Sequence, residues 1–228
     1  MFKEKIQTTW FRFARTLCRW SCRAFFRIRF EGLENIPAEG GFLLLCNHQS
    51  FLDPVLGGIV VKRPLWFVAR DTLFKNPVFG RLLSSVQALP IKRGQADIRA
   101  MKAVIDKLKA GMGFLLFPEG TRSKDGRIVQ IKPGFSLLCR RGNAAVVPVV
   151  IDGAFECWPR HKKRPSPGKI SVTYGEAITA ERIKELGDRK FADLLTQRLR
   201  QMQNQARIKA GKDVYNYQQD GISVEESE

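Results

Sequence analysis

A histidine and an aspartate stand five positions apart, just after the apolar run GFLLLC, as His48 and Asp53. On a regular helix, side chains at this spacing point about 140° away from each other. They can meet if His48 lies in a turn and Asp53 begins a helix, a start that Pro54 favours. Asp53 could then hold one imidazole nitrogen while the other accepts a proton from an alcohol, as acyl transfer requires. The alternative is a plain helix cap beside a hydrogen-bonded histidine.

A second polar turn follows another apolar run. The run GFLLF leads directly into FPEGTRS at residues 117–123. In this turn Arg122 can bind a phosphate, and Gly120 permits close approach of the backbone. Ligands of a parallel sheet bind beyond the carboxyl ends of its strands. Either turn alone is ordinary, but two polar turns at equivalent strand ends indicate a shared site.

The elements that must position these turns alternate along the chain. Short apolar runs that suit strands buried on both faces recur at residues 41–46, 65–69, 88–91, 113–117 and 145–151. Apolar spacings of three and four predict an amphipathic helix over Gln95–Ala110, closed by Gly111. This alternation predicts an α/β fold with a mostly parallel central sheet flanked by helices. Pro148 interrupts the last run, so we expect that strand to be bulged or at an edge.

The rest of the chain predicts one main domain over residues 31–210. Its later part reads as an exposed loop over 158–168, a strand over 169–174 and a surface helix over 191–207. Residues 211–228 are polar and end in acidic side chains, so we expect a flexible tail.

The first 30 residues are basic and aromatic, and they predict an amphipathic helix. At 100° per residue, one narrow face collects Lys5, Arg12, Arg15, Arg19 and Arg23, with Trp and Phe side chains opposite. Such a helix can lie in the headgroup region of a membrane, and packing on the protein's own core is an equal alternative. Arginines interrupt the apolar run that a secretion signal needs, and no stretch satisfies the requirement for a membrane span.

Composition narrows the class of ligand. The 228 residues include 39 Lys and Arg against 22 Asp and Glu, a net charge of +17. Such charge attracts nucleic acid, anionic lipid or phosphorylated ligands, and no nucleic-acid-binding signature accompanies it. Five scattered cysteines argue against a secreted disulfide framework and favour a reducing compartment. With two histidines and no C-x-x-C pair, we expect no metal site.

Four sequence blocks together resemble the glycerolipid acyltransferase family, most closely its lysophosphatidic acid acyltransferases. Asn47 and His48 with Asp53 match the NH-x4-D motif, and residues 117–123 match the third block. Residues 90–93 resemble the phosphate-binding arginine block, and 146–150 resemble the fourth. The blocks occur in the family's order over roughly residues 30–175.

The resemblance implies transfer of a fatty acyl group from a thioester to the 2-hydroxyl of lysophosphatidic acid, at the cytoplasmic face of a membrane. It implies that His48 is the general base and Asp53 its partner. The residues implied to bind the acceptor or its phosphate are Arg93, Glu119, Gly120, Thr121, Arg122 and Lys132. No cofactor is expected. The expected partners are membrane lipids and the donor, acyl-CoA or acyl carrier protein, and nucleic acid is not among them.

Rival functions stay open at this point. The motifs report the chemistry and not the acceptor, so glycerol-3-phosphate, another lysophospholipid or an aminoacyl lipid are alternatives. A noncatalytic peripheral membrane or nucleic-acid-binding protein is a rival from another class, and it predicts that His48 can be replaced without effect. The basic loop over Arg160–Arg164 can hold lipid headgroups or an acidic carrier protein, or be merely solvated.

Overall fold

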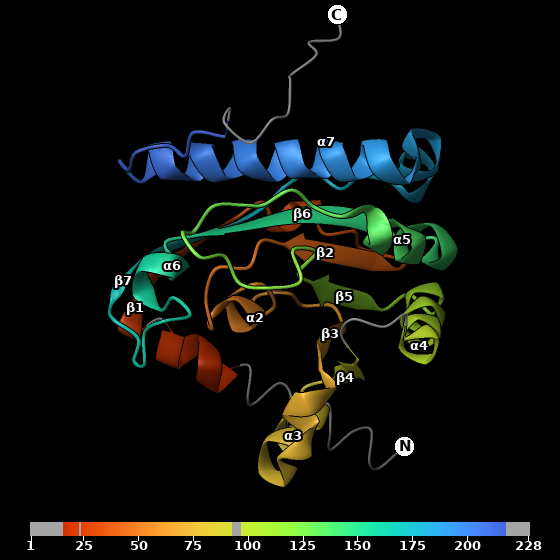
Figure 1. The fold of residues 1–228 in the computed structure, drawn as a ribbon, viewed down its shortest axis with the longest axis horizontal. Coiled ribbons are helices and arrows are strands. Elements are labelled where there is room, and N and C mark those ends of the chain that lie inside the picture. The colour runs from red at the N-terminus through yellow and green to blue at the C-terminus, as the bar shows by residue number, and fades with distance from the viewer. Residues whose placement is uncertain (1–15, 23, 93–96, 218–228) are drawn as a thin grey trace, which may run out of the picture.

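A computed structural model describes residues 16–22, 24–92 and 97–217. In this part of the chain, seven strands form one sheet in the order β1-β7-β6-β2-β5-β3-β4 (Figure 1). The strands are β1 (Phe26–Glu31), β2 (Phe42–Cys46), β3 (Leu65–Arg70), β4 (Ala88–Ile91), β5 (Gly113–Leu116), β6 (Ala145–Asp152) and β7 (Gly168–Tyr174). All neighbouring strands are parallel except β6 and β7. The predicted α/β fold with a mostly parallel sheet is confirmed.

Helices cover both faces of this sheet. They are α2 (Asp53–Leu56), α3 (Pro77–Ser85), α4 (Ile98–Lys109), α5 (Ser136–Gly142), α6 (Ala154–Cys157) and α7 (Ala180–Lys209), with 3-10 turns η1 (Leu33–Asn35), η2 (Asp71–Lys75) and η3 (Pro133–Phe135). Residues 16–22 and 24–25 are also helical. No helix among the described residues is long and apolar enough to cross a bilayer.

The central strand β2 shows how both faces become core. Its Leu43 and Leu45 pack with apolar residues of α4, α5 and α7. Its Phe42, Leu44 and Cys46 pack with residues of α2 and α6 on the other face. All five are fully buried, which explains the continuous apolar run. In Figure 1, α7 lies along one face of the sheet and α2 lies against the other.

The helix predicted over residues 1–30 ends before Phe26, because Phe26–Glu31 form the edge strand β1. Residues 1–15 and 23 lie outside the described residues. The segment FRIRF alternates apolar and basic side chains, which is the period of a half-buried strand. The strand pattern therefore replaces the helical one where β7 offers a partner, Phe26 pairing with Gly168.

Pro148 does not place its strand at an edge, since β6 lies between β7 and β2. Of the two alternatives, the edge position is wrong, and an irregularity in the pairing with the neighbouring segment, as expected of a bulge, accommodates the proline. Val149 pairs with Tyr174, whereas Val146 bridges to Ile178, so the register shifts by one residue across Pro148. Its carbonyl accepts a hydrogen bond from the Gly175 amide at 2.8 Å.

The helix predicted over 191–207 is longer and more buried than a surface helix. It begins at Ala180, where the Thr179 side chain caps it, and it kinks at Gly187. Phe191, Leu195 and Leu199 are fully buried against the sheet. The helix carries many exposed charges, which lower its mean hydropathy. Its buried apolar stripe was therefore not recognised from the sequence.

The tail predicted to fray from Gly211 is packed as far as residue 217. The backbone of Tyr215 exchanges two hydrogen bonds with the Asn204 side chain of α7, at 2.9 and 3.0 Å. The Tyr217 hydroxyl accepts a hydrogen bond from the Ile128 amide at 3.0 Å. These aromatic anchors within a polar segment hold it to the domain, and residues 218–228 lie outside the described residues.

We predict that Gly113→Ala lowers the free energy of unfolding by about 1–3 kcal/mol, the usual range for overpacking. Gly113 pairs with Phe42 across β5 and β2, and an added Cβ would overlap the buried Phe42 ring. Urea unfolding monitored by circular dichroism measures the change. Gly134→Ala is the matched control, since a Cβ there meets no atom within 4 Å. Equal stability of the two variants would show that this close contact does not constrain the sheet.

Candidate active site

The turn after β2 joins His48 to Asp53 as the sequence predicts. His48 lies in the turn, α2 begins at Asp53, and Pro54 occupies its first turn. His48 Nδ1 lies 2.8 Å from Asp53 Oδ2. The same Oδ2 accepts hydrogen bonds from the backbone amides of Gln49 and Ser50, each at 2.6 Å. Asp53 is therefore the partner of His48 and also holds the backbone of the turn that precedes the helix. It does not cap α2, whose N-cap residue is Leu52 without a side-chain hydrogen bond, so the helix-cap alternative is wrong.

Burial gives this pair its electrostatic character. The Asp53 side chain is fully buried and that of His48 is 15% exposed. Burial raises the pKa of the Asp53 carboxyl, and the hydrogen bonds from His48, Ser50 and Gln49 act against that rise. A carboxylate held in this way fixes one imidazole nitrogen and stabilises a positive charge on the ring. Nε2 of His48 is thus the nitrogen left to exchange a proton with a substrate.

Two amide side chains bind the turn to β6. The Asn47 Nδ2 donates to the Ile151 carbonyl at 3.0 Å, and its Oδ1 accepts from the Ile151 amide at 2.8 Å. The Gln49 Nε2 also donates to the Ile151 carbonyl. Sequence reasoning named Asn47 only as part of the motif and missed Gln49, because a residue about 100 positions away supplies their partner.

The turn after β5 contacts both the ring and the backbone of His48. The Phe117 ring stacks on the imidazole with centroids 4.1 Å apart and planes inclined by 24°. Glu119 Oε1 accepts a hydrogen bond from the His48 backbone amide at 2.7 Å, and the Ser123 amide donates to the His48 carbonyl at 2.7 Å. The contacts of Phe117 and Ser123 with His48 were not evident from the sequence. The two polar turns thus form one site, as their positions at strand ends predicted.

Glu119 is a second buried acid of this site whose protonation is altered. Burial raises the pKa of its carboxyl to about 7, and nearby Asp53 adds to the rise. The hydrogen bonds from the His48 and Val129 amides act in the other direction. Its carboxyl therefore links the protonation state of the site to the position of the His48 backbone.

Arg122 places a positive charge against the turn that carries His48. Its guanidinium lies over the Phe51 ring, with Cζ 3.6 Å from the centroid. Its Nη1 atom is buried and has no hydrogen-bond partner among the described residues. Burial lowers the pKa of Arg122, and the positive charges of Arg160 and Arg70 lower it further. Nearby Asp53 acts in the other direction and raises it. An unpaired guanidinium N–H is a donor that an anion could use.

The other predicted binding residues are less closely placed. Gly120 has φ 70°, and its amide closes a turn onto the Phe117 carbonyl at 3.0 Å. An added Cβ would meet nothing within 4 Å, so the turn needs its left-handed backbone and not its small size. Thr121 and Lys132 are exposed. Arg93 lies outside the described residues. Sequence reasoning missed Arg70, which ends β3 beside the site.

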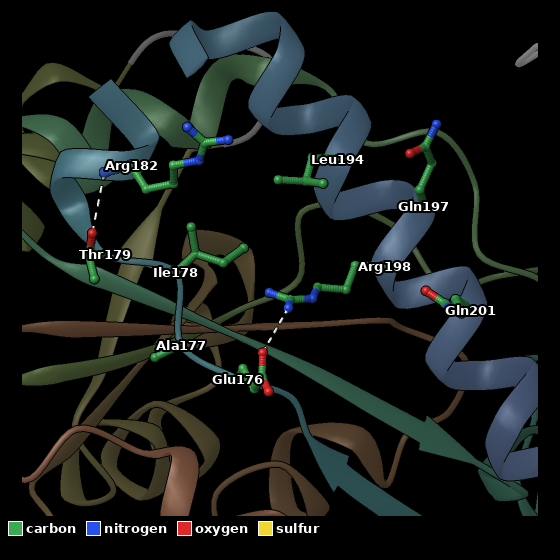
Figure 2. Close-up of a pocket in the computed structure, with 9 residues that line it drawn as sticks. All are labelled: Glu176, Ala177, Ile178, Thr179, Arg182, Leu194, Gln197, Arg198 and Gln201. Carbon is green, nitrogen blue, oxygen red and sulfur yellow. Dashed lines mark hydrogen bonds and ion pairs between the residues drawn. The ribbon is translucent and has the colours of Figure 1, made fainter. Parts of the chain in front are cut away.

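A shallow hollow lies on another part of the described surface. Figure 2 shows an open pocket between α7 and the segment that follows β7, where Arg198 forms an ion pair with Glu176 at 3.1 Å. No predicted site residue lines this pocket. Among the described residues, no group of three or more His, Cys, Asp or Glu side chains gathers as metal ligands.

Comparison with known proteins defines the family. A sequence model of the family described as Acyltransferase matches residues 27–152, more than half of the chain. The chain therefore belongs to the acyltransferase family, and the resemblance based on the four blocks is confirmed. The computed structure is similar to the crystal structure of the 1-acyl-sn-glycerophosphate (LPA) acyltransferase PlsC from Thermotoga maritima, with a TM-score of 0.75. The two chains are 24% identical, and the match covers 89% of this chain and 82% of that one.

Several relatives are named 1-acyl-sn-glycerol-3-phosphate acyltransferase. That of Pseudomonas aeruginosa is 34% identical over 75% of this chain and 66% of its own length. That of Bacillus subtilis is 27% identical over 78% of this chain and 88% of its own length. A chloroplastic relative from Arabidopsis thaliana is 33% identical over 59% of this chain. The match spans only 38% of that plant protein and about half or less of several others.

We predict that Glu119→Gln flattens the dependence of stability on pH between about 4.5 and 7. The pKa of the folded-state carboxyl is raised to about 7 from an ordinary 4.5. Within this window the folded state holds a proton that the unfolded state has released, so wild-type stability falls as the pH rises, by up to about 1.4 kcal/mol per pH unit. Urea unfolding at several pH values measures the slope. Glu34→Gln, at an exposed carboxylate, is the control, and identical slopes for Glu119→Gln and wild type would contradict the prediction.

Proposed function

We propose that this protein is an O-acyltransferase that transfers a fatty acyl group from a thioester to the 2-hydroxyl of 1-acyl-sn-glycerol-3-phosphate, giving phosphatidic acid. The observation that carries the proposal is the bond between His48 and Asp53, with Arg122 beside the same turn. Family membership and the names of the relatives from Pseudomonas aeruginosa and Bacillus subtilis support it.

In the proposed reaction, His48 Nε2 takes the proton of the acceptor's hydroxyl while Asp53 holds Nδ1. The hydroxyl oxygen attacks the thioester carbonyl carbon, and a tetrahedral intermediate forms. The carbon–sulfur bond then breaks, and the imidazolium returns its proton to the departing thiolate. One ester bond replaces one thioester bond, and the histidine ends neutral. The thioester supplies the activated acyl group, from acyl-CoA or acyl carrier protein, so these steps use no cofactor.

The acceptor's phosphate would occupy the site formed around Arg122. The buried Nη1 atom of Arg122 lacks a partner among the described residues, and a phosphate oxygen would supply one. A dianionic phosphate would also offset the repulsion that Arg70 and Arg160 exert on Arg122. Since this positive site lies next to His48, it favours an acceptor with a phosphate close to the reacting hydroxyl.

We also propose that the protein binds peripherally to the cytoplasmic face of a membrane through its amino-terminal helix. In the described part of that helix, Leu17 is 56% exposed and Trp20 is 70% exposed, while Arg19 is also exposed. Large apolar side chains left in water beside a cation suit the headgroup region of an anionic bilayer. The alternative, packing of this face on the protein's own core, leaves these exposures unexplained.

We predict that His48→Ala lowers the rate of acyl transfer to 1-acyl-sn-glycerol-3-phosphate about 10²–10⁴-fold, the usual contribution of a general base. The assay uses anionic vesicles, with acyl-CoA and acyl carrier protein as alternative donors. Circular dichroism checks that the variant is folded. Full activity in the variant would contradict the mechanism. Absence of transfer by the wild type from either donor would contradict the choice of acceptor.

We predict that Arg122→Gln raises the KM for the phosphorylated acceptor about 10–100-fold, the cost of losing charged hydrogen bonds to a phosphate. The KM for the thioester donor should change little, because the proposal assigns Arg122 to the phosphate of the acceptor. Arg141→Gln is a matched control, since it removes one exposed arginine on α5. A rise in the donor KM alone would assign Arg122 to the donor and overturn its role here.

A further inference from the structure

The segment after β3 forms an apolar projection. It consists of η2 and α3, which we call the η2–α3 knob, residues 71–85. Its large exposed side chains are Leu73, 42% exposed, Val78, 77%, Phe79, 42%, and Leu82, 46%. In Figure 1, α3 extends away from the sheet, on the side opposite to α7. Four neighbouring apolar side chains in water form a patch of the kind that marks an interaction surface.

Specific contacts hold the knob in its folded position. The Asn76 side chain caps α3, accepting hydrogen bonds from the Val78 and Phe79 amides at 3.1 and 3.0 Å. Gly80 is its one fully buried residue, and a Cβ added there would lie 2.7 Å from the Phe74 carbonyl oxygen. The helix therefore sits tightly on η2 with its apolar side chains directed outward. A cap and a close backbone contact maintain this exposure in the folded protein.

The knob lies at the end of the sheet where β2, β3 and β5 have their carboxyl ends, which also carries the site. We call this end the catalytic edge, as distinct from the edge strands β1 and β4. The knob follows the carboxyl end of β3, and the His48 and Glu119 turns follow the carboxyl ends of the parallel strands β2 and β5. Because β7 is antiparallel to β6 and parallel to β1, the amino ends of β1 and β7 point to this same edge. The amino-terminal helix precedes β1, and the basic loop over Arg160–Arg164 precedes β7. The amino-terminal helix, the basic loop and the knob therefore all lie at the same edge as the site.

We infer that the η2–α3 knob is a second lipid-contacting element, which inserts Val78, Phe79 and Leu82 into the boundary between headgroups and acyl chains. Exposed Lys75 and Arg81 stand beside these side chains and match an anionic bilayer. The same charges, in a chain of net charge +17, disfavour a second copy of this chain as the occupant. With the amino-terminal helix, the knob turns the catalytic edge toward the membrane. This inference adds to the proposed function and can be tested without any assay of acyl transfer.

Fluorescence quenching tests the inference directly. Phe79→Trp adds an emission that brominated phospholipids in phosphatidylcholine and phosphatidylglycerol vesicles should quench, measured relative to wild type. Leu33→Trp is the control, because Leu33 is 37% exposed and follows the carboxyl end of β1, at the opposite edge. Quenching of F79W and not of L33W supports the inference. Absence of quenching in F79W overturns it, whether or not the protein transfers acyl groups.

Vesicle binding gives a second measurement. Val78→Asp should preserve the fold, since its side chain is mostly exposed and an acid suits the first turn of a helix. We expect this variant to bind vesicles about tenfold more weakly than wild type, and Leu33→Asp to bind as wild type does. Equal loss in both variants would assign the effect to charge alone and contradict an apolar contact. A change in oligomeric state with unaltered vesicle binding would identify the knob as a protein interface instead.

Discussion

In the turn after β2, one carboxylate oxygen of Asp53 lies within hydrogen-bond distance of three nitrogens, Nδ1 of His48 and two backbone amides. A buried carboxylate is costly unless hydrogen bonds compensate it, so the turn folds around this oxygen. The Asn47 side chain binds the start of the turn to β6. Glu119, in the turn after β5, accepts a hydrogen bond from the His48 backbone amide. The orientation of the imidazole thus depends on contacts from three adjacent strands, which is why the reacting group can be rigid although it lies in a loop.

The topology of the sheet brings cationic side chains and exposed apolar side chains to the same end of the sheet. A phosphate needs cations, and the end of β3 and the turn after β5 supply Arg70 and Arg122. An acyl chain needs an apolar environment, and the same edge carries the exposed side chains of the amino-terminal helix and α3. The reversal of β7 relative to β6 brings the start of the chain to this edge. A bilayer offers both environments at its surface, so one edge can meet the lipid and its headgroup together.

Local patterns predicted most of this architecture. Buried strands such as β2 are continuous apolar runs, and the spacing of His48 from Asp53 required the turn that is observed. Features set by distant partners were not predictable. The role of Glu119 as acceptor for the His48 amide, and the approach of Arg160 to Arg122, join residues separated by long loops. The spacing of residues along the sequence does not indicate such contacts.

The central claim is that Asp53 holds Nδ1–H of His48 and leaves Nε2 free to accept a proton. The chain has only two histidines, so ¹⁵N-histidine NMR can resolve the tautomer of each ring. At about pH 8.5, where an ordinary imidazole is neutral, we predict that His48 in the full-length protein has a protonated Nδ1 and an unprotonated Nε2, and that Asp53→Asn weakens this preference. A protonated Nε2 in the wild-type protein would contradict the account, because that nitrogen could not serve as the base.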